Sequence, residues 1–101
     1  MQLSEYSDEA NKTNNQPHLY YHALGLGGES GEALEVIKKS YRPGRTLDSK
    51  ALEAELGDVL WYLNAVARTA GLTLEGIAER NLEKIRARQA QSPEGKMEGW
   101  K

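Results

Sequence analysis

Apolar side chains recur every three or four positions in four segments of the chain, and turns containing Gly or Pro separate these segments. Such a period is typical of α-helices that bury one face, whereas no segment sustains the two-residue alternation of a strand. We therefore predict an all-α fold with helices near Leu3–Lys12, His18–Ser40, Ser49–Ala70 and Leu74–Gln89.

The ends of two predicted helices carry residues suited to capping. Asp48 or Ser49 can be the N-cap of the third helix, and Thr73 that of the fourth. Gly71 stands where a glycine would close the third helix. With 101 residues we expect one domain, with a core of about 18–90 and a polar tail at 91–101.

Each of the two long helices is predicted to have an apolar stripe. The first stripe consists of Leu19, Ala23, Leu26, Ala33, Leu34 and Ile37, and the second of Leu52, Leu56, Val59, Leu60, Leu63 and Ala67. Glu29 and Glu55 lie at the edges of these stripes, and Glu32 and Asp58 are displaced by about 60° in the same sense. When the stripes face each other, the four carboxylates can converge on one rim.

Four carboxylates cannot crowd together without a cation, because like charges repel or raise each other's pKa. Carboxylate oxygens suit Mg²⁺, or Mn²⁺ as a substitute, and Mg²⁺ commonly binds through carboxylates together with substrate phosphates. The repeated spacing therefore predicts a metal site of Glu29, Glu32, Glu55 and Asp58 that serves phosphate chemistry. The alternative is that each acidic pair is an ordinary solvated helix face.

Four glycines, at positions 25, 27, 28 and 31, fall within the second predicted helix. Each costs roughly 1 kcal/mol relative to Ala in a helix interior. A conflict of this kind is expected where backbones or ligands must approach closely. The alternative is that this segment is a loop and that the helix begins only near Glu29.

Several other side chains are candidates for contacting a substrate. In the fourth helix, Asn81 lies within the apolar sector and Lys84 at its edge, so the pair can hold phosphate oxygens or a base edge; the alternative is a solvated face. Trp61 and Tyr62 can line a nucleobase pocket, and the alternative for Trp61 is packing in a core or interface. Lys12 and Arg45 are further candidates for phosphate contact.

The third helix also has small or apolar residues on its opposite face, namely Ala54, Gly57, Trp61 and Ala65. A helix that needs cover on two sides is central in its bundle. Because the chain has few other helices, we expect a second copy of the chain to supply the cover. The prediction is a four-helix-type bundle that oligomerisation completes.

Composition argues against several other classes of protein. The net charge of −2 gives no basic surface for nucleic acid. No stretch approaches the roughly 20 apolar residues that a membrane helix needs. The chain has no cysteine for a disulfide framework or thiolate metal site, and Met1–Asn15 lacks the apolar centre of a signal peptide. We expect a soluble, cytoplasmic protein.

Segments 23–39 and 55–63 together resemble the MazG-like nucleotide pyrophosphohydrolases. That family has a Glu-x-x-Glu on one helix and a Glu-x-x-Asp on the next, which Glu29/Glu32 and Glu55/Asp58 match. Segment 81–86 is similar to the family's last-helix signature, in which an Asn and a Lys contact the nucleotide. The likeness covers roughly positions 18–90.

The resemblance implies a helical homodimer or homotetramer that binds Mg²⁺ through the four carboxylates. It implies hydrolysis of a nucleoside triphosphate between the α- and β-phosphates, in a minimal single-domain form with a role in clearing unwanted nucleotides. One alternative is a phosphoribosyl-ATP pyrophosphohydrolase, which shares the fold and the acidic pattern. Another is a helical interaction module without catalysis.

Overall fold

The computed structural model describes residues 1–91, which form four α-helices and no strand. Helix α1 spans Leu3–Asn11, α2 spans Leu19–Ser40, α3 spans Ser49–Thr69 and α4 spans Leu74–Gln91. The four predicted helices are thus confirmed. The predicted tail lies outside the described residues except for Gln91, which is the last residue of α4.

The predicted N-caps of α3 and α4 are both present. The Asp48 carboxylate accepts a hydrogen bond from the backbone N–H of Ala51 at 3.0 Å. The Thr73 hydroxyl accepts one from the backbone N–H of Gly76 at 3.0 Å. Each bond satisfies an N–H group that has no partner inside its helix.

Helix α3 ends next to Gly71, as predicted. The Leu72 N–H donates to the Ala67 carbonyl at 2.8 Å, and the Gly71 N–H donates to the Arg68 carbonyl at 3.1 Å. Gly71 has a φ of 78°, a left-handed conformation that favours glycine. This turn stops α3 and redirects the chain into α4.

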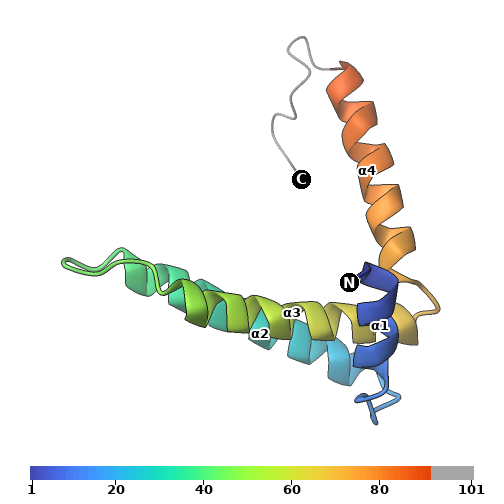
Figure 1. The fold of residues 1–101 in the computed structure, drawn as a ribbon, viewed down its shortest axis with the longest axis horizontal. Coiled ribbons are helices and arrows are strands. Elements are labelled where there is room, and N and C mark those ends of the chain that lie inside the picture. Colours follow the sequence, from blue (N-terminus) through green and yellow to red (C-terminus); the bar gives the residue numbers. More distant parts are fainter. Residues whose placement is uncertain (92–101) are drawn as a thin grey trace.

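Helices α2 and α3 form a long hairpin, and α1 packs on α3 near the end of the hairpin that lies away from the α2–α3 turn (Figure 1). Helix α4 extends away from the hairpin. The Cα radius of gyration is 16.5 Å, against about 13 Å for a compact domain of this length. The four helices of residues 1–91 therefore do not close into a bundle by themselves.

Most of the buried core lies where α1 meets the hairpin, and Ala33 is buried further along α2 toward the α2–α3 turn. Its fully or nearly fully buried residues are Ser7, Ala10, His22, Ala33, Asn64, Ala65, Ala67 and Leu74. Helix α1 packs on α3, Ala65 is buried, and Trp61 is half-buried with its indole N–H bonded to Thr13, just after α1. Ala54 and Gly57, nearer the α2–α3 turn, are exposed.

The packed face of α2 differs from the predicted stripe. His22 and Ala33 are buried and Glu29 is half-buried, whereas Leu19, Ala23, Leu34 and Ile37 are exposed. These four positions of the predicted stripe are not covered within the chain, and a purely apolar pattern leaves out His22 and Gly25, which both face α3. Glu29 consequently lies on the packed face rather than at its edge.

The glycine-rich segment is helical, so the loop alternative is excluded. A Cβ at Gly25 would overlap the Tyr62 ring, which shows how closely α2 and α3 approach there. A Cβ at Gly27, Gly28 or Gly31 would meet no other atom of the chain within 4 Å.

Large apolar side chains remain exposed on all four helices. Leu24, Leu34, Leu56 and Leu82 are 79%, 66%, 51% and 46% exposed. Among the described residues, no helix combines the length and the apolarity needed to cross a membrane.

Candidate metal centre

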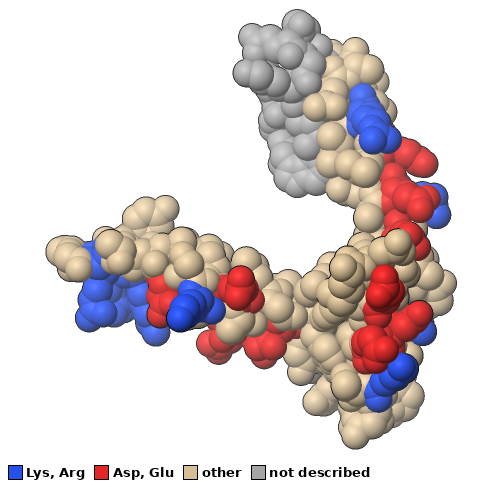
Figure 2. Space-filling view, in the orientation of Figure 1, with Lys and Arg blue, Asp and Glu red and all other residues tan. Residues whose placement is uncertain are grey.

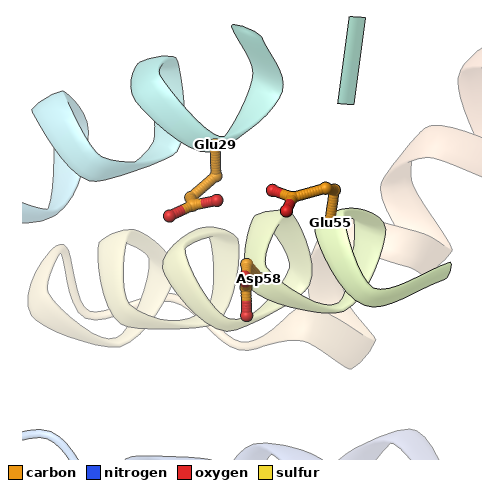
Figure 3. Close-up of side chains that lie close together, drawn as sticks. All are labelled: Glu29, Glu55 and Asp58. Atoms are coloured by element: carbon orange, nitrogen blue, oxygen red, sulfur yellow. The ribbon is translucent and has the colours of Figure 1, made fainter. Parts of the chain in front are cut away.

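Three of the four predicted carboxylates converge between α2 and α3 (Figure 3). One oxygen from each of Glu29, Glu55 and Asp58 lies within 4.8 Å of the other two. Glu55 and Asp58 are three residues apart, so a single turn of α3 carries both. Figure 3 shows Glu29 and Glu55 extending toward each other across the space between the helices.

The cluster is electrostatically strained. Burial raises the pKa of Glu29, as do a hydrogen bond shared with Glu55 and the negative charges of Asp58, Glu55 and Glu32. A hydrogen bond between two carboxyl groups requires a proton on one of them. Protonation of one carboxyl group, like a bound cation, lowers the negative charge of the cluster.

One atom of the cluster lacks any partner among the described residues. Oε2 of Glu55 is buried and makes no hydrogen bond. A buried carboxylate oxygen costs free energy unless a donor or a cation satisfies it. Hard oxygen donors are the ligands that Mg²⁺ and Mn²⁺ prefer, so the three residues fit such an ion.

Glu32 stands apart from the three. Its side chain is exposed on α2, one turn beyond Glu29. Its charge still contributes to the raised pKa of Glu29, so the two carboxylates are near enough to interact.

Tyr62, which the sequence offered with Trp61 as a residue that can line a nucleobase pocket, borders the carboxylates. It follows Asp58 by one turn of α3, and its ring fills the space that Gly25 leaves open. Burial raises the pKa of Tyr62, as do Tyr21, which also shares a hydrogen bond with it, and the charges of Glu29 and Asp58. The unfavourable glycine in α2 was the signal in the sequence that something packs closely there.

Trp61 packs between helices. Its indole Nε1 donates to Thr13 Oγ1 at 2.9 Å. Its ring lies edge-on to His22, with centroids 6.1 Å apart, and to Tyr62, with centroids 5.0 Å apart. In this arrangement Trp61 ties α3 to α2 and to the α1–α2 connection, which matches the packing alternative.

Asn81 and Lys84 lie elsewhere in the chain. They line a hollow of about 500 Å³ beside the α3–α4 turn, together with Arg80, Leu72 and Ile77. Because α4 extends away from the hairpin (Figure 1), this hollow is separate from the carboxylates of the same chain.

The two remaining candidates are on the surface. Lys12 Nζ pairs with Glu9 Oε1 at 3.1 Å on α1, and both side chains are exposed. Arg45 is exposed in the α2–α3 turn.

Comparison with known proteins identifies the family. A family model described as the MazG nucleotide pyrophosphohydrolase domain matches residues 17–92. The "Gene 37 protein" of Mycobacterium phage L5 is 36% identical over 75 residues, which cover 70% of this chain and 66% of that protein, slightly less than two thirds of its length. No solved structure matches the chain significantly. Because the family model covers well over half of the sequence, this chain belongs to the MazG nucleotide pyrophosphohydrolase domain family.

Proposed function

We propose that this protein is a Mg²⁺-dependent nucleoside triphosphate pyrophosphohydrolase. It cleaves an NTP or dNTP between the α- and β-phosphates and releases a nucleoside monophosphate and pyrophosphate. The observation that carries the proposal is the convergence of Glu29, Glu55 and Asp58, with one buried oxygen left unsatisfied, in a chain of this family.

Each carboxylate has a role in the proposed reaction. Glu29, Glu55 and Asp58 hold the metal, with Glu32 as the fourth ligand. When bound, Mg²⁺ supplies positive charge that offsets the charge on the phosphate oxygens, a task for which Mn²⁺ can substitute. The carboxylates orient a water in line with the α-phosphorus, and a glutamate accepts its proton. The bond from the water oxygen to phosphorus forms as the bond to the pyrophosphate oxygen breaks.

The proposal includes assembly into a homodimer or homotetramer. A second copy packed on the hairpin would cover the exposed leucines, including Leu24, Leu34 and Leu56. It would also bring an α4, with Asn81 and Lys84, toward carboxylates that have no α4 beside them in one chain. The cation and the amide would then bind phosphate oxygens or a base edge. We propose clearance of unwanted nucleotides as the physiological role.

The test is a panel of NTPs, dNTPs and phosphoribosyl-ATP, incubated with the full chain and Mg²⁺. Pyrophosphate and orthophosphate are measured separately. We expect pyrophosphate as the primary product from at least one nucleoside triphosphate, and loss of the reaction when EDTA replaces Mg²⁺. Orthophosphate as the sole primary product would reject the reaction type. Turnover of phosphoribosyl-ATP alone would assign a different substrate, and no turnover at all would favour an interaction module.

A further inference from the structure

The carboxylate cluster is bordered by an aromatic ring on the side away from the α2–α3 turn. On α3, Glu55, Asp58 and Tyr62 are spaced by three and four residues, so they share one face. The ring of Tyr62 reaches α2 at Gly25, where it fills the volume that a Cβ would occupy. Gly25 lies one helical turn before Glu29. Tyr62 therefore packs between the two helices, next to the carboxylates of both.

Tyr21 extends this aromatic border by one more turn of α2. Tyr21, Gly25 and Glu29 are spaced by four residues, so they follow one another along one side of the helix. Tyr62, which packs on Gly25, is thus flanked by Tyr21 on one side and Glu29 on the other. The two phenols also share a hydrogen bond. Eight residues of helix span about 12 Å, so Tyr21 lies about the length of a nucleoside monophosphate from Glu29.

Buried neighbours hold both tyrosine rings in place. The Tyr21 ring packs edge-on to His22, with centroids 5.5 Å apart, and the Tyr62 ring packs edge-on to Trp61, with centroids 5.0 Å apart. His22 is fully buried, and its Nε2 bonds with the Gln16 carbonyl at 2.7 Å. Tyr21 itself is 50% exposed. It therefore combines a fixed position with a ring surface that a ligand can reach.

The charges of the hairpin favour one orientation of a nucleotide in the site. Figure 2 shows Lys and Arg gathered at the turn end of the hairpin. Near the opposite end, Arg68 already pairs with Asp8. Phosphates are attracted to the turn end. With the α-phosphate at the carboxylates and the pyrophosphate toward the turn, the nucleoside extends toward Tyr62 and Tyr21. The cations at the turn end are Lys38, Lys39, Arg42, Arg45 and Lys50.

We propose that Tyr21 is a specificity-determining residue on which the base of the substrate stacks, beside Tyr62. The inference rests on the proposed function for its substrate class, and it goes further by naming the surface that receives the nucleoside. Stacking on an aromatic ring depends on the base, so replacing Tyr21 changes the preference among nucleotides and not merely the affinity for all of them.

The experiment measures binding, so it does not depend on turnover. The probes are the α,β-methylene analogues of ATP, CTP, GTP and UTP and of the corresponding dNTPs. They are titrated calorimetrically with Mg²⁺ into the wild type, Tyr21→Leu and Tyr21→Phe. We expect Tyr21→Leu to change the affinity ratio between the tightest and weakest analogues by about fivefold or more. Tyr21→Phe retains the ring and should keep most of the preference.

The matched control is Tyr20→Leu. Tyr20 is the neighbouring residue on α2 and is 84% exposed. It points about 100° away from Tyr21 around the helix, so it lies off the side that carries Gly25 and Glu29. The same loss of a phenol ring at this position should leave the affinity ratio unchanged.

The outcomes separate this inference from the proposed reaction. If Tyr21→Leu weakens all the analogues equally, or alters the ratio no more than Tyr20→Leu does, the inference is wrong. Equal binding of all bases by the wild type would also overturn it. If the wild type binds the analogues but hydrolyses no nucleotide, the proposed reaction is wrong while the Tyr21 variants still decide the inference. If the wild type binds none of the analogues, both are wrong.

Discussion

Two groups of polar side chains lie between helices in this protein, and they differ in how well their hydrogen bonds are satisfied. Between α1 and α3, donors meet acceptors: Ser7 bonds with Asn64, and Arg68 bonds with Ser7 and Asp8. Between α2 and α3, carboxylates meet carboxylates: burial and the neighbouring Glu55, Asp58 and Glu32 raise the pKa of Glu29, and Oε2 of Glu55 lacks a partner among the described residues.

The contrast separates a structural contact from a ligand site. The α1–α3 network is satisfied within the chain, so it stabilises the fold under any solution condition that keeps its charges. The carboxylate cluster costs stability until a cation binds. Polar groups left unsatisfied between two well-packed helices are therefore the ones that indicate chemistry.

The largest expected effect is on activity. Glu55→Gln keeps the size of the side chain and removes the charge that holds the metal, so kcat/KM should fall by about 10²–10³. Glu53→Gln is the matched control, because Glu53 is exposed on the same helix and should change activity little. Initial rates of pyrophosphate release measure both variants. Equal activity of the two variants would remove Glu55 from the site.

A smaller effect is expected on stability at the satisfied network. Ser7→Ala leaves the buried Asn64 side chain without its hydroxyl partner and should lower the free energy of unfolding by about 1–3 kcal/mol. Urea unfolding measures the change, with Ser4→Ala on the same helix as control. A change below about 0.5 kcal/mol would mean that the network contributes little.

At the carboxylate cluster, we expect a substitution to raise the stability of the metal-free protein and not to lower it. In EDTA, Glu29→Gln should raise the Tm, because it removes one of the repelling carboxylates. The folded pKa of Glu29 is raised, so the stability from its protonation is present at acid pH and is lost as the pH rises through that pKa. The advantage of the variant should therefore grow with pH from acid to neutral. A lower Tm for the variant at neutral pH would contradict the account.

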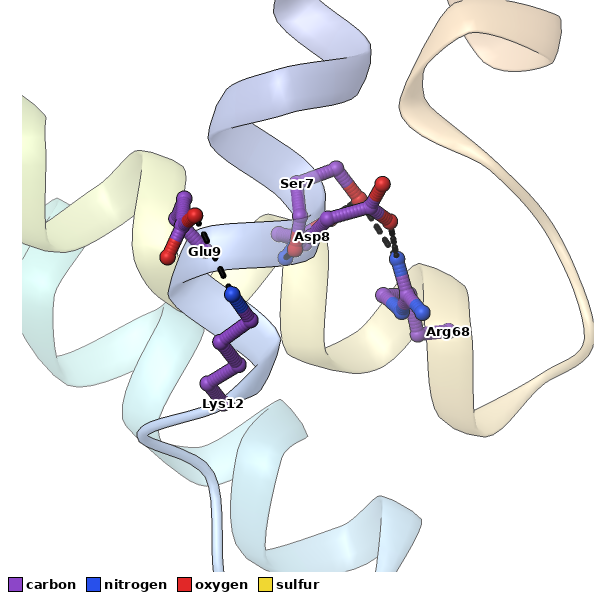
Figure 4. A network of polar contacts seen from close by, with 6 residues as sticks. Ser7, Asp8, Glu9, Lys12 and Arg68 are labelled. Carbon is purple, nitrogen blue, oxygen red and sulfur yellow. Dashed lines mark hydrogen bonds and ion pairs between the residues drawn. The ribbon is translucent and has the colours of Figure 1, made fainter.

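The smallest effects are expected from exposed ion pairs. Lys12→Gln breaks the pair with Glu9 and should cost less than about 0.5 kcal/mol, because both side chains are exposed. Arg68→Gln also removes a bond to the buried Ser7 and should cost more, about 1 kcal/mol. Figure 4 shows both pairs, and urea unfolding compares them. Equal costs would show that the bond to Ser7 adds nothing.

The sequence predicted the features that depend on local periodicity. Helical period located the four helices, with capping residues at two of them. The i, i+3 spacing predicted that Glu29, Glu55 and Asp58 converge, whereas Glu32, which was predicted with them, is exposed and lies outside the cluster. These features follow from the geometry of a single helix, or from two helices facing each other.

Features that depend on tertiary contact were not predictable in the same way. The packed face of α2 includes His22, because Gln16 accepts its hydrogen bond. Helix α1 covers α3 because Ser7 and Asn64 bond across 57 positions in the chain. The position of Asn81 away from the carboxylates depends on how α4 leaves the closing turn of α3. No pattern of neighbouring residues in the sequence predicts any of these three features.

The most direct test of the central claim is a calorimetric titration of Mg²⁺, or of Mn²⁺ as a tighter-binding substitute, into the wild type, Glu55→Gln and Glu53→Gln. The account predicts that the wild type and Glu53→Gln bind the ion alike, and that Glu55→Gln binds it at least about tenfold more weakly. Equal affinity of Glu55→Gln and the wild type would contradict the assignment of the metal to this cluster.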